Sequence, residues 1–430
     1  MRRFLIILAT AFPLSAETTV TLLHFSDYHS HALPFYTDEG ERGGIARAIG
    51  YLRQQKRGGA LVFSGGDTVN KGAPAWSDKY QCAEWPWWNG IVDAMAFGNH
   101  DVDYGAEALA KCRKSTKYPI LSANTPGFRP YVVLKSKGAR IGVFAVAGAD
   151  FARLVKGYTF RDPVAAARET VRTLREKERV DAVVLIGHQD VDDDYALARA
   201  VPGIDVIFGS HSHLKRDLVQ IPDTKTTYIS PSQYLTYISR VELIVDKGFV
   251  KSVRGGLIPV DASLPEDRVI AQRVARMQQE LERDPQYSAL FAPISTLPAP
   301  IGTEALGMRA LDAMRAATNA TVAISTKSSF RGPLAAGTLT MESLRGAMPY
   351  DNEIVVCAMS DAQLRNLLKV AGETSYVTAI EPASEHRVAT TDYMAHVAYK
   401  DAFACDKKMT GLRVREELRV RLGEKVKGKK

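Results

Sequence analysis

Cysteines and long apolar runs are scarce in this sequence of 430 residues. None of its four cysteines has the short paired spacing of a zinc or redox motif, which excludes a site built on such thiolate pairs. No apolar run reaches the roughly 20 residues that a membrane-spanning helix requires. The overall composition is that of a globular protein. We expect two domains, because single hydrophobic cores stop growing beyond roughly 250 to 300 residues.

The first 16 residues have the pattern of a secretory signal peptide. Arg2 and Arg3 precede an apolar run from Phe4 to Leu14, and the small residues Ser15 and Ala16 follow it. A buried helix or a membrane anchor fits less well, because the run is too short to span a bilayer. We therefore predict cleavage after Ala16 and a periplasmic or secreted protein without stable membrane insertion.

Export would place the cysteines in an oxidising compartment, where disulfides form and persist. Three connectivities are possible, and we favour pairing within each half of the chain, Cys82 with Cys112 and Cys357 with Cys405. Free buried thiols are the alternative.

The formal net charge of +8 is concentrated at the ends of the chain. Residues 413–430 hold eight Lys or Arg against three Glu. Such a basic tail could contact membrane phosphate or nucleic acid, but we favour a frayed, solvated helix end. No nucleic-acid partner is predicted.

Strand-like apolar runs alternate with amphipathic stretches from residue 19 to about residue 260, which predicts an α/β domain. The expected strands are 19–25, 60–64, 91–97, 140–147, 181–186 and 204–208, followed by an antiparallel pair at 237–245 and 249–260. The expected helices are 45–56, 104–114, 163–177, 305–317 and 361–370.

The domain organisation that we predict has five parts. They are a signal peptide (1–16), a first domain (17–265), a connecting helix with a proline-punctuated linker (266–300), a smaller second domain (301–412) and a basic tail (413–430).

Metal-type side chains follow five of the strands in the first domain. They are Asp27 and His29, then Asp67, then Asn99 and His100, then His188, and finally His211 with His213. Any one of them has an ordinary explanation, since Asp and Asn favour turns and a lone His is more often a satisfied polar residue. Together they place five of the nine histidines at the edge of the sheet where α/β proteins bind ligands. The pattern predicts a metal site.

Imidazole, carboxylate and amide ligands suit divalent ions such as Zn, Mn, Fe or Co, and these ligands are too many for one ion. Two ions roughly 3.5 to 4 Å apart, bridged by a carboxylate and a hydroxide, can hold a phosphoryl group for in-line attack by that hydroxide. We therefore expect a two-metal phosphoesterase.

The five blocks resemble those of the calcineurin-like metallophosphoesterases, which implies a four-layer αββα sandwich. Within that superfamily the segments 98–105 and 121–124, together with the second domain, are most similar to the bacterial 5′-nucleotidases. The resemblance implies that Asp27, His29, Asp67 and His213 hold one ion, and that Asp67, Asn99, His188 and His211 hold the other. It also implies that Asp67 bridges the ions, that His100 is the catalytic histidine and that Asp103 orients its ring.

In that family an α+β second domain supplies an arginine for the phosphate and two aromatic rings for the nucleobase. By resemblance, Arg331 is the arginine, and Tyr350 and Tyr393 are the rings beside Asn352. Half-buried core tyrosines are the alternative. This chain departs from the family at Ser328 and Ser329, which replace a glycine pair, and at 396–399, where a glycine-rich loop is replaced.

The residues and the resemblance together predict hydrolysis of nucleotide phosphate esters. One alternative keeps the metals but acts on cyclic nucleotides, UDP-sugars or a non-nucleotide phosphoester. Another is a non-catalytic binding protein, which a full ligand set argues against.

Overall fold

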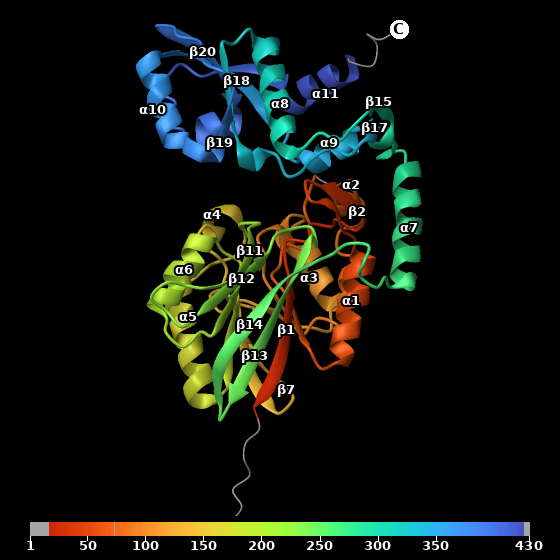
Figure 1. Cartoon of the computed structure of the whole chain (residues 1–430), viewed down its shortest axis with the longest axis vertical. Helices are drawn as coiled ribbons and strands as arrows, with labels where there is room; N and C mark the ends of the chain where they lie inside the picture. The colour runs from red at the N-terminus through yellow and green to blue at the C-terminus, as the bar shows by residue number, and fades with distance from the viewer. Residues whose placement is uncertain (1–16, 73, 425–430) are drawn as a thin grey trace, which may run out of the picture. The chain divides into compact units, whose positions relative to one another are not determined.

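The computed structural model describes residues 17–72 and 74–424, so the predicted signal peptide lies outside the described residues (Figure 1). The described chain forms two compact units. Unit 1 comprises the residues up to Tyr28, Tyr51–Asp67 and Trp85–Pro259, and unit 2 comprises His29–Gly50, Thr68–Glu84 and the residues from Val260 onward.

Two six-stranded sheets form the centre of unit 1. The first has the order β14 (Phe249–Pro259), β13 (Tyr237–Asp246), β1 (Thr18–Phe25), β4 (Leu61–Ser64), β5 (Ala94–Ala96) and β6 (Ile120–Leu121). The second has the order β11 (Lys215–Gln220), β12 (Thr227–Pro231), β10 (Val206–Phe208), β9 (Ala182–Ile186), β8 (Ala139–Phe144) and β7 (Tyr131–Ser136). Strands β1, β4, β5 and β6 run parallel, as do β8, β9, β10 and β12.

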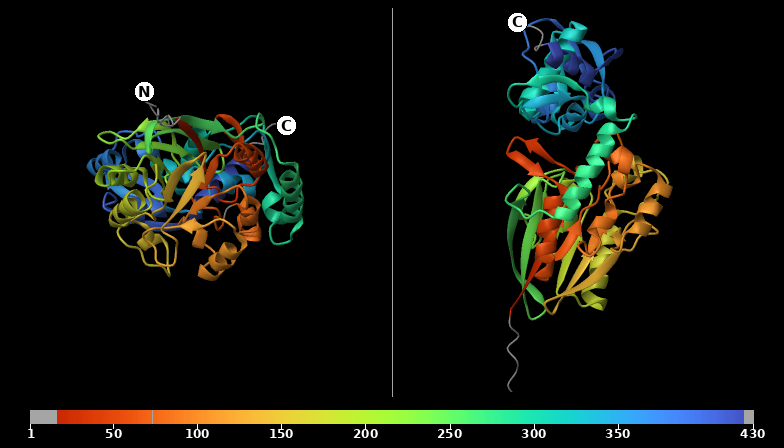
Figure 2. Two further views of the ribbon diagram at one scale, coloured as in Figure 1. Left: turned by 90° about the horizontal axis from the view of Figure 1, so that it is seen from below. Right: turned by 90° about the vertical axis from the view of Figure 1, so that its right-hand side faces the viewer.

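The sheets pack face to face, with helices on the outer faces (Figures 1 and 2). Apolar side chains from both sheets form the core between them, among them Leu22, Phe63, Val184 and Phe208, all fully buried. The helices are α1 (Ile45–Arg57, whose first residues belong to unit 2), α3 (Ala106–Ser115), α4 (Phe151–Leu154), α5 (Pro163–Arg172) and α6 (Val191–Ala200), with short turns η1 (Trp85–Trp88), η2 (His100–Val102) and η3 (Thr173–Lys177). This is the predicted αββα architecture.

The start of α5 shows how local sequence sets an element. Pro163 occupies the first turn, where a missing N–H costs nothing, and Asp162 accepts a hydrogen bond from the Ala165 N–H. The predicted helix 163–177 ends as an α-helix at Arg172 and continues as the π-helical turn η3. Its buried face, which includes Val171 and Leu174, packs on the second sheet.

Unit 2 contains a five-stranded sheet with the order β19 (Ser375–Val377), β16 (Val322–Thr326), β20 (Glu385–Thr391), β18 (Glu353–Ser360) and β21 (Lys408–Arg413). Its helices are α2 (Ala75–Tyr80), α7 (Arg268–Arg283), α8 (Thr303–Thr318), α9 (Met341–Ala347), α10 (Asp361–Ala371) and α11 (Val414–Glu424). Short turns are η4 (Ser288–Phe291), η5 (Lys327–Ser329), η6 (Gly372–Thr374) and the π-helical η7 (Met394–Ala398). Two strand pairs complete it, β2 (Pro34–Thr37) with β3 (Gly40–Gly43) and β15 (Pro293–Leu297) with β17 (Gly337–Thr340).

Two predictions for the second half were wrong. The expected linker is structured from Ser288, because η4 and β15 form there and β15 pairs with β17. The expected solvated tail is a packed helix as far as Gly423. Val414, Leu418 and Leu422, spaced four residues apart, place their side chains in the core of unit 2. Charge alone had suggested a solvated segment, but the apolar stripe decides.

Among the residues that the structure describes, no helix combines the length and the apolar character needed to cross a membrane.

The tryptophan-rich segment after residue 75 is a packed loop. Trp76, Trp85, Trp87 and Trp88 are all buried. The Trp88 ring stacks on Phe25, with 4.5 Å between ring centroids. The segment therefore contributes core, as one of the two sequence interpretations held.

Cys357 and Cys405 form a disulfide, which confirms the pairing predicted for the second half, and Cys82 and Cys112 are also disulfide-bonded. The Cys357–Cys405 bond closes a loop with a sequence separation of 48 residues. Removing it is expected to destabilise unit 2 by about 2–4 kcal/mol, since the unfolded chain regains the entropy of the open loop. Denaturant unfolding of a Cys357→Ala/Cys405→Ala double variant measures this. Unchanged stability would mean that the bond constrains little.

A fully buried carboxyl in α6 gives a prediction about pH. Asp194 is 0% exposed and accepts a hydrogen bond from the Gln189 side chain at 2.8 Å. Burial raises the pKa of the Asp194 carboxyl well above its ordinary value. The native state then holds its proton more tightly than the unfolded chain, so stability falls as pH rises from about 4 toward the native pKa. Asp194→Asn removes this cost. In thermal unfolding with chelator present, its stability advantage should widen from pH 5 to pH 8, and a constant difference would contradict the argument.

Candidate metal centre

The predicted ligands follow the carboxyl ends of parallel strands. Asp27 comes after β1, Asp67 after β4, Asn99 after β5, His188 after β9, and His211 with His213 after β10. Parallel strands end at the same edge of their sheet, so the loops carrying these residues gather there. His29 follows two residues after Asp27.

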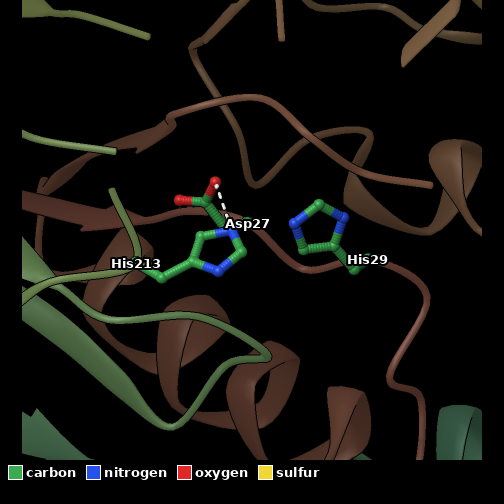
Figure 3. Close-up of side chains that lie close together, drawn as sticks. All are labelled: Asp27, His29 and His213. Atoms are coloured by element: carbon green, nitrogen blue, oxygen red, sulfur yellow. Dashed lines mark ion pairs between the residues drawn. The ribbon is translucent and has the colours of Figure 1, made fainter. Parts of the chain in front are cut away.

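Two groups of side chains are close enough to hold a cation. In each group the possible ligand atoms all lie within 4.8 Å of one another. Asp27, His29 and His213 form the first group (Figure 3), and Asp67, His188 and His211 form the second. Asn99 adjoins the second, because its Oδ1 lies 3.2 Å from His188 Nε2. The arrangement matches the two sets of ligands expected from the sequence.

The backbone at these positions is unusual. Asp27, His29, Asp67, His211 and His213 all have φ between 48° and 64°, a left-handed conformation that side chains other than glycine rarely adopt. Such strain is retained where the surrounding structure holds it for a function. Five strained residues that converge in space fit a ligand cage better than ordinary turns.

His188 is held in one orientation. Its Nδ1–H donates to the Gly65 carbonyl at 2.6 Å, so the lone pair is on Nε2. That Nε2 lies 3.2 Å from Asp67 Oδ2. Burial opposes protonation of this fully buried ring, but the Asp67 carboxylate outweighs it and raises the pKa of His188 to about 10. The site attracts positive charge, which a bound cation would supply in place of the proton.

The first group is organised around a buried carboxylate. Asp27 is 0% exposed and accepts a hydrogen bond from the His211 N–H at 3.1 Å. Its Oδ1 lies 3.4 Å from His213 Nε2 (Figure 3). Burial would raise the pKa of Asp27, but the neighbouring His213 lowers it, and the net result is a strongly acidic group. His29 Nδ1 lies 3.2 Å from the Val69 carbonyl, which leaves the lone pair on Nε2.

His100 and Asp103 form a pair beside the second group. His100 Nδ1 lies 2.8 Å from Asp103 Oδ2, and the His100 backbone N–H donates to Asp67 Oδ1 at 2.8 Å. Burial lowers the pKa of His100, but Asp67 and then Asp103 outweigh burial and raise the pKa to about 9. The ring is therefore able to carry a proton next to the ligand groups. Asp101 instead accepts a hydrogen bond from the Gly98 N–H at 2.9 Å, a structural role within its own loop.

The predicted substrate-binding side chains of unit 2 are accessible. Tyr350 and Tyr393 are 47% and 45% exposed, so they are surface residues and the half-buried alternative was wrong. Arg331 Nη2 lies 3.2 Å from Tyr350 Oη, and its guanidinium lies 5.7 Å from the centre of that ring. Asn352 is half-buried, and its carbonyl accepts a hydrogen bond from the Val414 N–H.

Sequence reasoning missed Asp150 and Phe151. Asp150 Oδ2 lies 3.3 Å from His211 Nε2, and the Phe151 ring contacts the rings of His188 and His211, at 5.8 and 6.2 Å between centroids. A signal was present, since Asp150 also follows a strand, β8, at the same edge of the sheet.

Comparison with known proteins agrees with this geometry. Residues 20–215 match the family model described as calcineurin-like phosphoesterase, and residues 292–379 match the model described as 5′-nucleotidase, C-terminal domain. The chain belongs to the 5′-nucleotidase family. The protein is thus a metal-dependent phosphoester hydrolase, and the family implies divalent metals.

Individual relatives of this 5′-nucleotidase family member are distant. Protein UshA of Yersinia enterocolitica is 25% identical over 422 residues, covering 82% of this chain and 76% of that protein. A 5′-nucleotidase of Vibrio cholerae is 30% identical over 292 residues, covering 56% of this chain and 52% of that protein. The crystal structure of a 5′-nucleotidase precursor from Thermus thermophilus has the same fold, with a TM-score of 0.73, 20% identity and coverage of 95% and 96%.

Proposed function

We propose that the protein is an exported phosphatase that hydrolyses phosphate esters of nucleotides with the help of two divalent cations. The observation that carries the proposal is the pair of three-residue ligand groups beside the His100 and Asp103 pair. The leader sequence and the disulfides support a periplasmic or secreted location.

Asp27, His29 and His213 would hold one cation, and Asn99, His188 and His211 the other, with Asp67 shared between them. Asp67 suits this role because its carboxylate lies against His188 and acts electrostatically on Asp27 of the other group. The donors are imidazole, carboxylate and amide, which fits Zn, Mn, Fe or Co. Cations bound here would supply positive charge for the phosphoryl oxygens and make water more acidic.

His100 is placed to stabilise the transferring phosphoryl group or to give a proton to the leaving oxygen. Its ring is oriented by Asp103, and that carboxylate favours the cationic imidazole. A proton transfer of this kind contributes roughly 10²–10⁴-fold to a rate.

The topology of unit 2 supports a common recognition surface. Arg331 follows β16, Tyr393 follows β20, and Tyr350 precedes β18. Because β16 runs parallel to β20, and β18 antiparallel to it, these three ends lie at one edge of the sheet. An arginine and two exposed rings at one edge suit a phosphate and a base.

Alanine at Tyr350 and Tyr393 tests the nucleotide part of the proposal. Each substitution should raise KM for a nucleoside monophosphate by about 5- to 100-fold, because stacking on one ring contributes about 1–3 kcal/mol. KM and kcat for a plain aryl phosphate should stay the same, since that substrate has no base. Tyr376→Phe is a control within the same unit, because that ring is half-buried against Phe330.

The same substrate panel separates the alternatives. Equal loss on both substrates, or equal wild-type rates on both, would remove the nucleoside-binding role and favour a non-nucleotide phosphoester. Faster hydrolysis of a cyclic nucleotide or a UDP-sugar would keep the metal chemistry and change the leaving group. Binding without any hydrolysis after metal loading would leave a binding protein.

A further inference from the structure

The loop after β8 is built around the two histidines of the second ligand group. His188 N–H donates to the Val146 carbonyl at 3.0 Å, and Gly148 N–H donates to the His188 carbonyl at 2.9 Å. Phe151, which is fully buried, then places its ring against both imidazoles. Residues 146–151 therefore form a wall behind His188 and His211.

Asp150 extends from this wall toward His211. Its Oδ2 lies 3.3 Å from His211 Nε2, and its side chain makes no capping hydrogen bond to α4 within the described chain. Gly148 leaves room for the carboxylate, because a Cβ at that position would lie 2.7 Å from Asp150 Oδ1. The carboxylate is thus directed at the imidazole and has no role in holding its own helix.

The two ring nitrogens of a histidine lie on different sides of the ring, and a hydrogen bond at one fixes which nitrogen carries the lone pair. If His211 Nε2–H donates to Asp150, the lone pair is on Nδ1. That nitrogen would then serve the group with Asp67 and His188. His188 is held the opposite way, with Nδ1 on Gly65 and Nε2 directed at Asp67.

We propose, building on the proposed function, that Asp150 is the positioning residue of His211. It would hold the ring in the Nε2–H form and make its Nδ1 a stronger ligand for the second cation. Outer carboxylates of this kind contribute roughly 10–100-fold to metal affinity.

Other charges near His211 provide a matched control. Asp193 is exposed and influences both Asp150 and His211 electrostatically. Asp190 faces away to Ser212, whose Oγ donates to it at 3.1 Å. Asp193→Asn therefore removes a negative charge from the same neighbourhood and leaves the Asp150–His211 contact in place.

The test is a zinc titration of metal-free, full-length protein against a competing chelator. Asp150→Asn should weaken one of the two ions by about 10- to 100-fold and leave the other unchanged. Asp150→Glu should recover part of the loss, and Asp193→Asn should bind both ions like wild type. Equal affinity in Asp150→Asn and wild type, or an equal loss in Asp193→Asn, would overturn the proposal. If Asp150→Asn does not fold, the glutamate variant and the control decide by the same comparison.

Long-range ¹⁵N NMR of histidine-labelled, zinc-loaded wild type gives a readout that a structural role would not move. His211 should appear with zinc on Nδ1 and a proton on Nε2. Zinc on Nε2 would overturn the proposal and make Asp150 a direct competitor for the ion. The wild-type titration keeps the two proposals apart, since fewer than two ions, or two ions without phosphatase activity, would contradict the proposed function whatever the state of His211.

Discussion

Replacing His100 with alanine is expected to lower kcat by about 10²-fold or more and to leave the metal content unchanged. His100 lies beside the ligand groups without belonging to either, and its ring is held by Asp103 at 2.8 Å. Its loss therefore removes a proton donor or a positive charge near the leaving oxygen, whereas the cage that holds the cations stays complete. Steady-state kinetics together with metal analysis of the same preparation measure both quantities.

Asp103→Asn provides a graded companion to this variant. The ring would stay but lose the carboxylate that favours its charged form, so a smaller fall in kcat is expected. A His100 variant that loses its metal would show that the residue is structural. Unchanged kcat in a fully loaded His100 variant would remove its catalytic role.

Replacing Asp67 with asparagine is expected to have the largest effect of any single change. Asp67 Oδ2 lies 3.2 Å from His188 Nε2, its Oδ1 accepts the His100 N–H, and its charge raises the pKa of both rings. A neutral amide could not balance two cations, and cations of this kind stabilise the transition state by several kcal/mol. We expect at least one ion to be lost and turnover to fall by about 10³-fold or more.

The exposed Asp217 is a suitable control, since Asp217→Asn removes a carboxylate of unit 1 that belongs to neither ligand group. Metal analysis and kinetics of the two variants form the comparison. An Asp67 variant that keeps two ions and most of its activity would show that this carboxylate is not shared.

The sequence was most informative at the ends of parallel strands. Asp67, His188 and His211 could be placed together because each follows a strand of the same direction, and the fold brings such ends to one edge. The same rule applied to Asp150 after β8, but one acidic residue in a loop gives no pattern. Only the 3.3 Å distance to His211 reveals its relation to the site.

Packing decided what the sequence could not. The basic charge of 413–430 suggested a solvated tail, yet Leu418 and Leu422 are buried. The proline-punctuated stretch before residue 300 gave little periodicity, because β15 is a short strand that forms only by pairing with β17. Segments 29–50 and 68–84 cluster with the later part of the chain, and contacts such as Asp38 with Thr303 are distant in sequence.

The exposure of Tyr350 and Tyr393 was likewise undetermined in the sequence, since a tyrosine suits both a core edge and a surface. Their exposed fractions settle that point in favour of availability to a ligand.

The central claim, a centre of two cations that performs the reaction, is tested most directly by adding manganese stepwise to metal-free protein. Bound metal and phosphatase activity are followed together. The account predicts two ions per chain, with activity that rises only as the second ion binds. Full activity with a single ion, or without any ion, would contradict it.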